Sequence, residues 1–471
     1  MLTGTLASRV IAILAIPILA RIYTPAEFGL LAMFMTINAI VSSVACARYE
    51  MAIVLPEDDA DAMHILLACV AISTGVSLAC FCLYWLFGTE LAQFVGIPEL
   101  APYLWLSPLA IWFIGAFNAC QSWASRTGQF SGISRAIVAG TFSTVTTQFL
   151  MGFPQKLLAG GLIVGQSIGR LMQFSQLVWC CRKSMRASFA QGIAWSRIRE
   201  LLSRYRNFPI YDSTASLLNS SSRELPVLML GIFFTPTIIG FYSVGRRMLK
   251  VPMQLIDNAI SRVFFPKARQ EMQKGNLPQL VLTVFVKLST IGVVPMLSVT
   301  VIAPAVVGVF LGETWEESGI YVQWLSIWLL IVFITAPFAQ LFNVLEKQRA
   351  RLLYQIVLML VRFSALLIGG MLDQPVLAVA LFSVASAIVS MLNCLWLLKA
   401  SGLSPGIPVR YFFLELFKAI PFIAAIAGLN WWLQADWQVL IAAAIVLGVF
   451  ALMRYRGALN RDYIEIEGAA H

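Results

Sequence analysis

The sequence has few charged residues and almost no histidine. Only 12% of its 471 residues are charged, which is about half of the fraction in an average soluble domain. Two histidines, His64 and His471, are too few for a histidine-centred catalytic site. None of the eight cysteines forms a CxxC pair or has a histidine at metal-ligand spacing, so we interpret them as small buried hydrophobic residues and expect no metal site.

Apolar segments without any Asp, Glu, Lys or Arg are abundant. Hydrophobic residues make up 59% of the chain, and its mean hydropathy is +0.81. A helix needs roughly 20 apolar residues to cross a bilayer core of about 30 Å. The uncharged segments that reach this length are 62–89, 100–125, 288–312, 318–345 and 374–398. The sequence therefore predicts an all-α polytopic membrane protein.

We predict about 14 transmembrane helices, joined by loops too short to fold as separate soluble domains. Their expected limits are 4–22, 28–47, 61–88, 102–125, 135–154, 158–181, 211–234, 238–264, 280–311, 319–344, 351–371, 374–398, 411–432 and 435–453. The first span lacks the basic leader of a signal peptide, so we expect the chain to begin close to the membrane.

Lysine and arginine in the loops predict the orientation of the chain. Loops after even-numbered spans, with the C-terminal tail, hold 22 of these bases, whereas loops after odd-numbered spans hold only Arg21 and Lys156. Cytoplasmic loops are enriched in Lys and Arg. Both termini should therefore be cytoplasmic, and the net charge of +10 is interpreted as a topology signal rather than as a nucleic-acid surface.

The chain is expected to contain two similar halves. Residues 24–29 and 235–240 both read T-P-x-x-x-G, 211 residues apart, and each pattern breaks a helix. Six spans separate the two turns, which implies a parallel repeat. We expect a six-helix lobe over 1–181, a basic cytoplasmic linker over 182–210 that contains an amphipathic interfacial helix, a second six-helix lobe over 211–398, and two additional helices with a tail over 399–471.

Two neighbouring spans carry polar residues at helical spacing. Those of the seventh span are Asp212, Ser216, Asn219, Ser220 and Arg223, and those of the eighth are Ser243, Arg246, Lys250, Gln254, Asp257 and Ser261. Each set falls on one face of a helix. Charges inside a membrane usually face a cavity, which favours a wet, cationic chamber between the halves. The alternative is that these bases snorkel to the interface or pair with Asp212, Glu224 and Asp257.

Other charges near the spans are open to two interpretations. Arg9 would face the same chamber if the first span mirrors the seventh, whereas Arg170, Lys287, Arg362 and Lys418 are typical of snorkelling residues as well. The carboxylates of residues 58–61 resemble a Mg²⁺–diphosphate motif. Because they follow a proline and precede a helix, we favour a helix cap.

Several motifs resemble those of a known family. They are residues 20–29 (ARIYTPAEFG), 48–56 (RYEMAIVLP), 205–211 (YRNFPIY), 225–226 (LP), 240–243 (GFYS), 246–247 (RR) and Pro252. They resemble the Wzx-type oligosaccharide flippases of the multidrug/oligosaccharidyl-lipid/polysaccharide exporter superfamily. The likeness covers residues 1–270 and is loose afterwards. The N-terminus lacks the basic leader common in that family, which puts in doubt whether Met1 is the native start.

The resemblance implies two six-helix lobes around a central cationic cleft, plus two further helices. It also implies an undecaprenyl-diphosphate-linked oligosaccharide as cargo, which arginine suits because it binds phosphate through two parallel hydrogen bonds. The residues expected to bind substrate are Arg223, Arg246, Arg247, Lys250, Arg9, Arg48, Asn219 and Gln254. Those expected to form ion pairs that exchange during gating are Asp212, Glu224, Asp257 and Glu50.

The sequence thus predicts a flippase of the bacterial inner membrane for lipopolysaccharide or exopolysaccharide synthesis, and not an enzyme. Its partners would be lipid-linked oligosaccharide, membrane lipids and other polysaccharide assembly proteins, without nucleic acid. We expect no cofactor, and H⁺ or Na⁺ coupling stays open. The alternatives are a cation-coupled multidrug exporter of the same fold, which would need more carboxylates, and a membrane-embedded polysaccharide polymerase, which would need a larger outer loop.

Overall fold

The structure is a computed structural model that describes residues 2–153, 158–190, 192–433 and 436–460. Of these, residues 2, 3, 5, 158, 159, 250–263, 265 and 454–460 are described by their backbone alone. This part of the chain contains helices and no strand. It divides into two compact units, residues 1–243 and 244–471.

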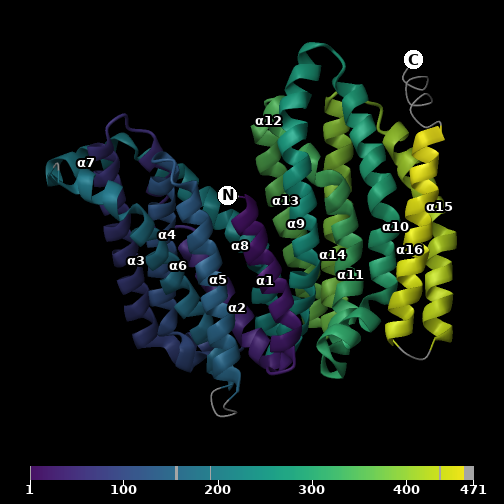
Figure 1. Cartoon of the computed structure of the whole chain (residues 1–471), viewed down its shortest axis with the longest axis horizontal. Coiled ribbons are helices and arrows are strands. Elements are labelled where there is room, and N and C mark those ends of the chain that lie inside the picture. The colour runs from purple at the N-terminus through teal and green to yellow at the C-terminus, as the bar shows by residue number, and fades with distance from the viewer. Residues whose placement is uncertain (1, 154–157, 191, 434–435, 461–471) are drawn as a thin grey trace. The chain divides into compact units, whose positions relative to one another are not determined.

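The first unit is built from eight α-helices, the beginning of a ninth and three shorter helical segments (Figure 1). These are α1 (Leu2–Ala20), α2 (Pro25–Ser42), η1 (Tyr49–Val54), α3 (Asp59–Phe94), η2 (Pro98–Tyr103), α4 (Leu106–Arg126), α5 (Phe130–Gly152), α6 (Leu158–Phe189), α7 (Trp195–Arg204), the π-helix η3 (Phe208–Asp212), α8 (Ser213–Phe233) and the start of α9 (Pro236–Gln273). Here α5 packs on α6 and α1, and α2 packs on α4, α6 and α8.

The second unit contains the rest of α9 and the remaining helices. These are α10 (Leu277–Leu311), η4 (Glu313–Trp315), α11 (Glu316–Thr335), η5 (Ala336–Gln340), α12 (Leu341–Val344), α13 (Gln348–Met371), α14 (Pro375–Ala400), α15 (Gly406–Trp432) and α16 (Asp436–Asn460). Helix α10 packs on α11, α15 and α16, and α14 packs on α11 and α13. The predicted lobe limits stay a prediction, because the compact units divide inside α9.

Each of the fourteen predicted spans corresponds to one long helix of the described chain, namely α1–α6, α8–α11 and α13–α16. Several limits were wrong by five residues or more, since α3, α6 and α9 run past their predicted ends and α5 begins before its predicted start. The second span was expected to reach residue 47, but α2 ends at Ser42 and the chain then turns through left-handed residues. The tenth span is divided, because Pro337 lies in the short helix η5 that separates α11 from α12.

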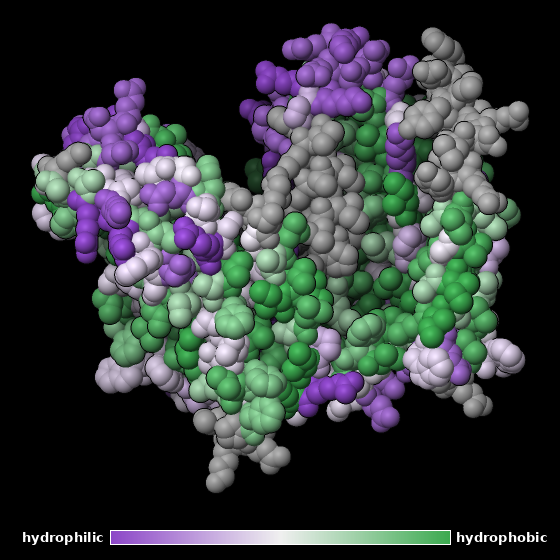
Figure 2. Space-filling view, in the orientation of Figure 1, coloured by the Kyte–Doolittle hydropathy of each residue, from purple (hydrophilic) through white to green (hydrophobic). Residues whose placement is uncertain are grey.

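Eight helical segments of the described chain are long and apolar enough to cross a membrane. They are residues 25–42, 59–94, 277–311, 313–344, 348–371, 375–400, 406–432 and 436–453. Figure 2 shows hydrophobic residues along the outer sides of α15 and α16, and hydrophilic residues gathered at the upper end of each unit. Residues 6–20 of α1 form a shorter apolar helical segment.

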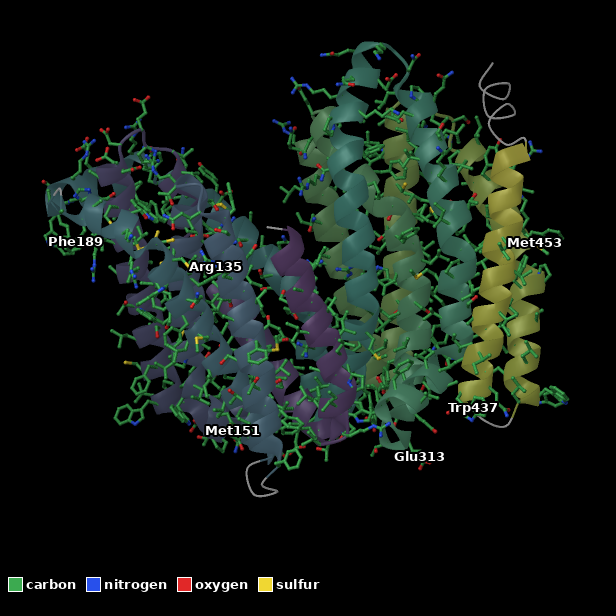
Figure 3. All side chains as sticks on the ribbon, in the orientation of Figure 1. Arg135, Met151, Phe189, Glu313, Trp437 and Met453 are labelled. Atoms are coloured by element: carbon green, nitrogen blue, oxygen red, sulfur yellow. The ribbon has the colours of Figure 1, made fainter. Side chains whose placement is uncertain are left out.

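Labelled residues in Figure 3 show the direction of several long helices within each unit, whereas the orientation predicted from the loop charges stays a prediction. In the first unit Phe189, at the end of α6, lies at the end opposite to Met151 of α5 (Figure 3). In the second unit Glu313 and Trp437 share one end, and Met453 lies further along α16, away from that end.

The predicted amphipathic helix of the linker is α7. Ile198 and Leu201 are its buried residues, and they pack towards α3. Arg197 binds Asp61 of α3 through two hydrogen bonds of 2.8 and 2.6 Å. His64 of α3 also accepts a hydrogen bond from the backbone N–H of residue 194 at 3.1 Å. This linker helix is therefore fastened to the first unit.

The two T-P-x-x-x-G turns meet inside the first unit. A Cβ atom placed on Gly29 would lie 1.8 Å from the carbonyl oxygen of Pro236, and one on Gly240 would lie 1.8 Å from that of Pro25. The first turn is closed by a capping box, in which Thr24 N donates to Glu27 Oε2 at 2.7 Å. The two repeated motifs therefore contact each other. The absence of a side chain at each glycine lets the backbone of the other helix approach closely.

Three tryptophans surround the turn between α15 and α16. Trp431 is 89% exposed, Trp432 is 74% exposed and Trp437 is 56% exposed. Tryptophan is enriched where a membrane meets water. This end of the helix pair therefore has the composition of a membrane interface.

Candidate functional site

The polar face predicted for the seventh span is carried by η3 and α8. Asp212, Asn219 and Arg223 are exposed, and the Ser216 hydroxyl donates to the carbonyl of Ser43 at 3.3 Å. Residues three and four apart lie on the same side of an α-helix. Such side chains are retained in a membrane where they reach water or a polar partner. The described chain therefore exposes three polar side chains of this face, one of them a guanidinium group, whereas Ser220 of the same face is buried.

Helix α2 supplies a polar contact to α8 that the sequence analysis missed. Thr36 is 2% exposed, and its Oγ1 donates to Oε2 of Glu224 at 3.3 Å. Beside it, Nη2 of Arg223 donates to Oγ of Ser220 at 3.4 Å. A single threonine in an apolar helix gives no periodic signal, so only the packing of the two helices reveals its role.

The turn after α2 holds the predicted Arg48 and Glu50 together. Ala47 and Arg48 have φ angles of 48° and 62°, the left-handed region that residues other than glycine rarely adopt. Nη1 of Arg48 lies 3.2 Å from Oε1 of Glu50. Glu50 is 7% exposed, so its carboxylate lies in a largely dry environment beside a single cation.

The helix η1, which carries Glu50, packs against α3, α4 and η3 in the first unit. Burial raises the pKa of the Glu50 carboxyl above its usual value, a hydrogen bond from the backbone N–H of Glu50 and the charge of Arg48 oppose that rise, and the carboxylate of Asp212 adds to it. The predicted gating residues Glu50 and Asp212 are thus neighbours that repel each other electrostatically. Arg48, Glu50 and Asp212 form one cluster, which we call the Arg48 cluster.

The remaining predicted site residues lie on α1 and α9. Arg9 and Arg246 are half-buried, and Arg247 is exposed. Lys250, Gln254 and Asp257 lie outside the side chains that the structure describes. That the bases of α9 share a chamber with those of α8 therefore stays a prediction.

The acidic stretch after Pro56 begins a helix, as the cap interpretation predicted. Asp58 precedes α3 at the N-cap position, although its side chain makes no capping hydrogen bond. Asp59 and Asp61 lie in the first turn and bind Arg126 and Arg197, at 2.8 and 2.6 Å. In the described chain no group of three or more His, Cys, Asp or Glu residues is placed to hold a metal ion.

Two of the other bases near the spans have partners within the second unit. Nε of Arg362 donates to Oγ of Ser386 at 3.1 Å, and its guanidinium lies 5.3 Å from the centre of the Trp328 ring. Nζ of Lys418 lies 3.0 Å from Oε1 of Glu415. Protein groups hold Arg362, so snorkelling is not needed to explain its position.

The profile of one family, described as polysaccharide biosynthesis protein, matches residues 18–320. The chain belongs to this family. Two curated relatives agree. The amylovoran biosynthesis protein AmsL of Erwinia amylovora is 21% identical over 238 residues, which are 49% of this chain and 58% of AmsL. The succinoglycan biosynthesis transport protein ExoT of Rhizobium meliloti (strain 1021) is 25% identical over 320 residues, which are 66% of this chain and 61% of ExoT.

Solved structures identify the fold of this family member. The lipid II flippase MurJ, in an inward closed conformation, is similar with a TM-score of 0.77 at 12% identity, over 98% of this chain and 100% of MurJ. An inward-facing multidrug resistance transporter of the MATE family is similar with a TM-score of 0.66 at 12% identity, over 84% of this chain and 95% of the transporter. The predicted all-α polytopic membrane fold is confirmed. The chain spans about three fifths of the length of the curated relatives it matches.

Proposed function

We propose that this protein moves an oligosaccharide linked to undecaprenyl diphosphate from the cytoplasmic to the periplasmic leaflet of a bacterial inner membrane, for lipopolysaccharide or exopolysaccharide synthesis. It does so by alternating access of a cationic cavity, without chemical change of the cargo. Family membership supports the pathway, and the names of ExoT and MurJ support transport and the flipping of a lipid-linked sugar.

The observation that carries this proposal is the polar face of α8. Arg223 is exposed on α8, and Asn219, also exposed, lies one turn away on the same face. A guanidinium group binds phosphate oxygens through two parallel hydrogen bonds, and an amide binds sugar hydroxyls. The prenyl chain stays in the lipid while this face receives the diphosphate and the sugar.

In the first unit alone, the predicted site is balanced in charge. Three bases, Arg9, Arg48 and Arg223, stand against three acids, Glu50, Asp212 and Glu224. On α9 the predicted site residues Arg246, Arg247 and Lys250 outnumber the single acid Asp257, so the excess positive charge of the predicted set comes from that helix.

The test replaces Arg223 and Arg246 together by glutamine. Cells carrying the double variant should make no surface polysaccharide although the protein inserts in normal amount, and reconstituted protein should not flip a fluorescent lipid-linked sugar. The matched control is Arg135→Gln, because Arg135 is exposed on α5 and its Nε donates to the carbonyl of Ser131 in its own helix. Normal polymer in the double variant would refute the proposal.

Membrane orientation belongs to the same proposal, with both termini in the cytoplasm. Reporter fusions after α6 should be active in a cytoplasmic assay, and fusions at Glu313 should be active in a periplasmic assay. The opposite result would reverse the direction in which cargo moves.

A second candidate is export of drugs with cation coupling, because the fold is similar to that of a MATE transporter. The two candidates differ in cargo charge. A deletion strain that keeps its polymer and becomes sensitive to cationic drugs would support the exporter. Loss of all polymer, rather than chains of a single repeat unit, would support the flippase over a polymerase.

A further inference from the structure

The Arg48 cluster stands on a strained turn. Two consecutive residues with side chains, Ala47 and Arg48, occupy the left-handed region, at a cost of roughly 1–2 kcal/mol each. Such strain persists where the surroundings fix the backbone, and it is found mostly at functional sites. The segment that faces the turn is also irregular, because Phe208–Asp212 is a π-helix, and short π-helical turns are frequent at functional sites.

The turn leaves two buried polar atoms without partners. Within the described chain neither Oε2 of Glu50 nor Nε of Arg48 has a hydrogen-bond partner, although both atoms are buried. The other oxygen of Glu50 meets Nη1 of Arg48 at 3.2 Å. A buried carboxylate with one unsatisfied oxygen is costly, and a proton on that oxygen would remove the charge.

The surroundings of Glu50 act on its protonation in opposite directions: burial and Asp212 favour it, whereas Arg48 opposes it. Arg48 is the cation in contact with it, and η3 contributes the carboxylate of Asp212. Helix α3 contributes the buried thiol of Cys69. Helix α4 contributes Arg126, which donates to the carbonyl of Ile53 and to groups of residues 56–59 rather than to Glu50. Within the described chain, the ion pair with Arg48 is the contact that holds the Glu50 carboxylate.

We propose that Glu50 is a proton-binding site linked to the binding of an anionic head group at Arg48. The proton comes from water and converts the carboxylate of Glu50 to a carboxylic acid. Arg48 then loses its counter-ion, and its guanidinium group becomes available to two oxygens of a diphosphate. Binding of the head group and uptake of the proton favour each other by thermodynamic linkage. This inference rests on the proposed function for its ligand, but the proton site can be tested alone.

The first test follows the proton without any ligand. Infrared difference spectra of the full chain in nanodiscs, taken between about pH 4 and about pH 9 to span the range of buried carboxyl groups, should contain a protonated-carboxyl band that disappears in Glu50→Gln. The control is Glu57→Gln, because Glu57 is exposed in the next segment and its loss should leave the band unchanged. If Glu50→Gln retains every protonated-carboxyl band of the wild type, the proton site is refuted.

The second test measures binding of undecaprenyl diphosphate over the same pH range. Wild-type affinity should fall by up to tenfold per pH unit above the pKa of Glu50, in addition to any change that all variants share because the probe itself titrates. Glu50→Gln should bind tightly without this extra dependence. Asp212→Asn should shift the dependence to lower pH, because removal of a neighbouring negative charge lowers the pKa of Glu50.

The outcomes separate the two proposals. If the infrared band is present but undecaprenyl diphosphate does not bind at any pH, the proposed function fails and the proton site stands. If binding occurs and Glu50→Gln has the same pH dependence as wild type, the linkage is refuted and the proposed function stands. Arg48→Gln serves as a further check, since it should weaken binding and also abolish the extra pH dependence.

Discussion

Replacing Gly29 by alanine should separate α2 from the first turns of α9. The added Cβ would lie 1.8 Å from the carbonyl oxygen of Pro236 and 2.7 Å from its carbonyl carbon. Carbon and oxygen atoms pack at about 3.5 Å, so the two backbones must move apart by roughly 1.5 Å. The obstacle is backbone rather than a flexible side chain, so rotation of a side chain cannot relieve it.

The cost follows from the size of this overlap. Overpacking of a close contact destabilises a protein by about 1–3 kcal/mol, and Gly29→Ala should fall in the upper half of that range. Alanine is otherwise favoured over glycine inside a helix by about 1 kcal/mol, which offsets part of the loss. Gly240→Ala should behave alike, because its Cβ would lie 1.8 Å from the carbonyl oxygen of Pro25.

Thermal unfolding of the purified protein in detergent measures the effect. The matched control is Gly75→Ala in α3, because a Cβ at Gly75 would meet nothing within 4 Å. That control should be neutral or stabilising, whereas Gly29→Ala should lower the melting temperature. The double variant Gly29→Ala/Gly240→Ala should cost less than the sum of the single changes, because either one already opens the same contact. A melting temperature of Gly29→Ala equal to that of Gly75→Ala would refute the reasoning.

Three further predictions concern the segment between α2 and α3 and the linker helix. Arg126→Ala should destabilise the protein by about 3 kcal/mol in denaturant unfolding, because Arg126 binds Asp59 and three backbone carbonyls. A free energy of unfolding equal to that of the wild type would contradict this. Asp61→Asn and Arg197→Gln should each increase the rate at which trypsin cleaves α7, and by a similar factor, because each removes the same ion pair. If the double variant is cleaved no faster than either single variant, the ion pair is confirmed as the contact that protects α7. The melting temperature should fall as pH rises from about 4.5 through the raised pKa of Glu50, because the folded state holds that proton more tightly, and Glu50→Gln should remove this component.

Most of the fold could be predicted from the sequence because a helix that crosses a membrane needs a long apolar segment. Long apolar segments predicted the fourteen long helices, and threonine, proline and glycine at 24–29 predicted the start of α2. The end of α2 was not accessible. Nothing in the composition of residues 43–47 signals a left-handed turn at Ala47 and Arg48, since tertiary contacts impose it.

The candidate site was only partly predictable. Spacing alone gave the face of α8, because helical periodicity determines which side chains share a side. Spacing did not reveal that Asp212 lies beside Glu50, or that Thr36 contacts Glu224. Those relations join segments more than 150 residues apart in the chain, and only packing decides them.

The tryptophans at the α15–α16 turn have a mechanical consequence. Indole rings resist movement both into hydrocarbon and into water, so Trp431, Trp432 and Trp437 anchor that tip at one depth. Arg410, exposed near the other end of α15, has a long side chain that tolerates displacement. When the bilayer thickness changes, tilting or local thinning will therefore occur at the end of α15 that carries Arg410. The turn that carries the three tryptophans will stay at the same depth in the membrane.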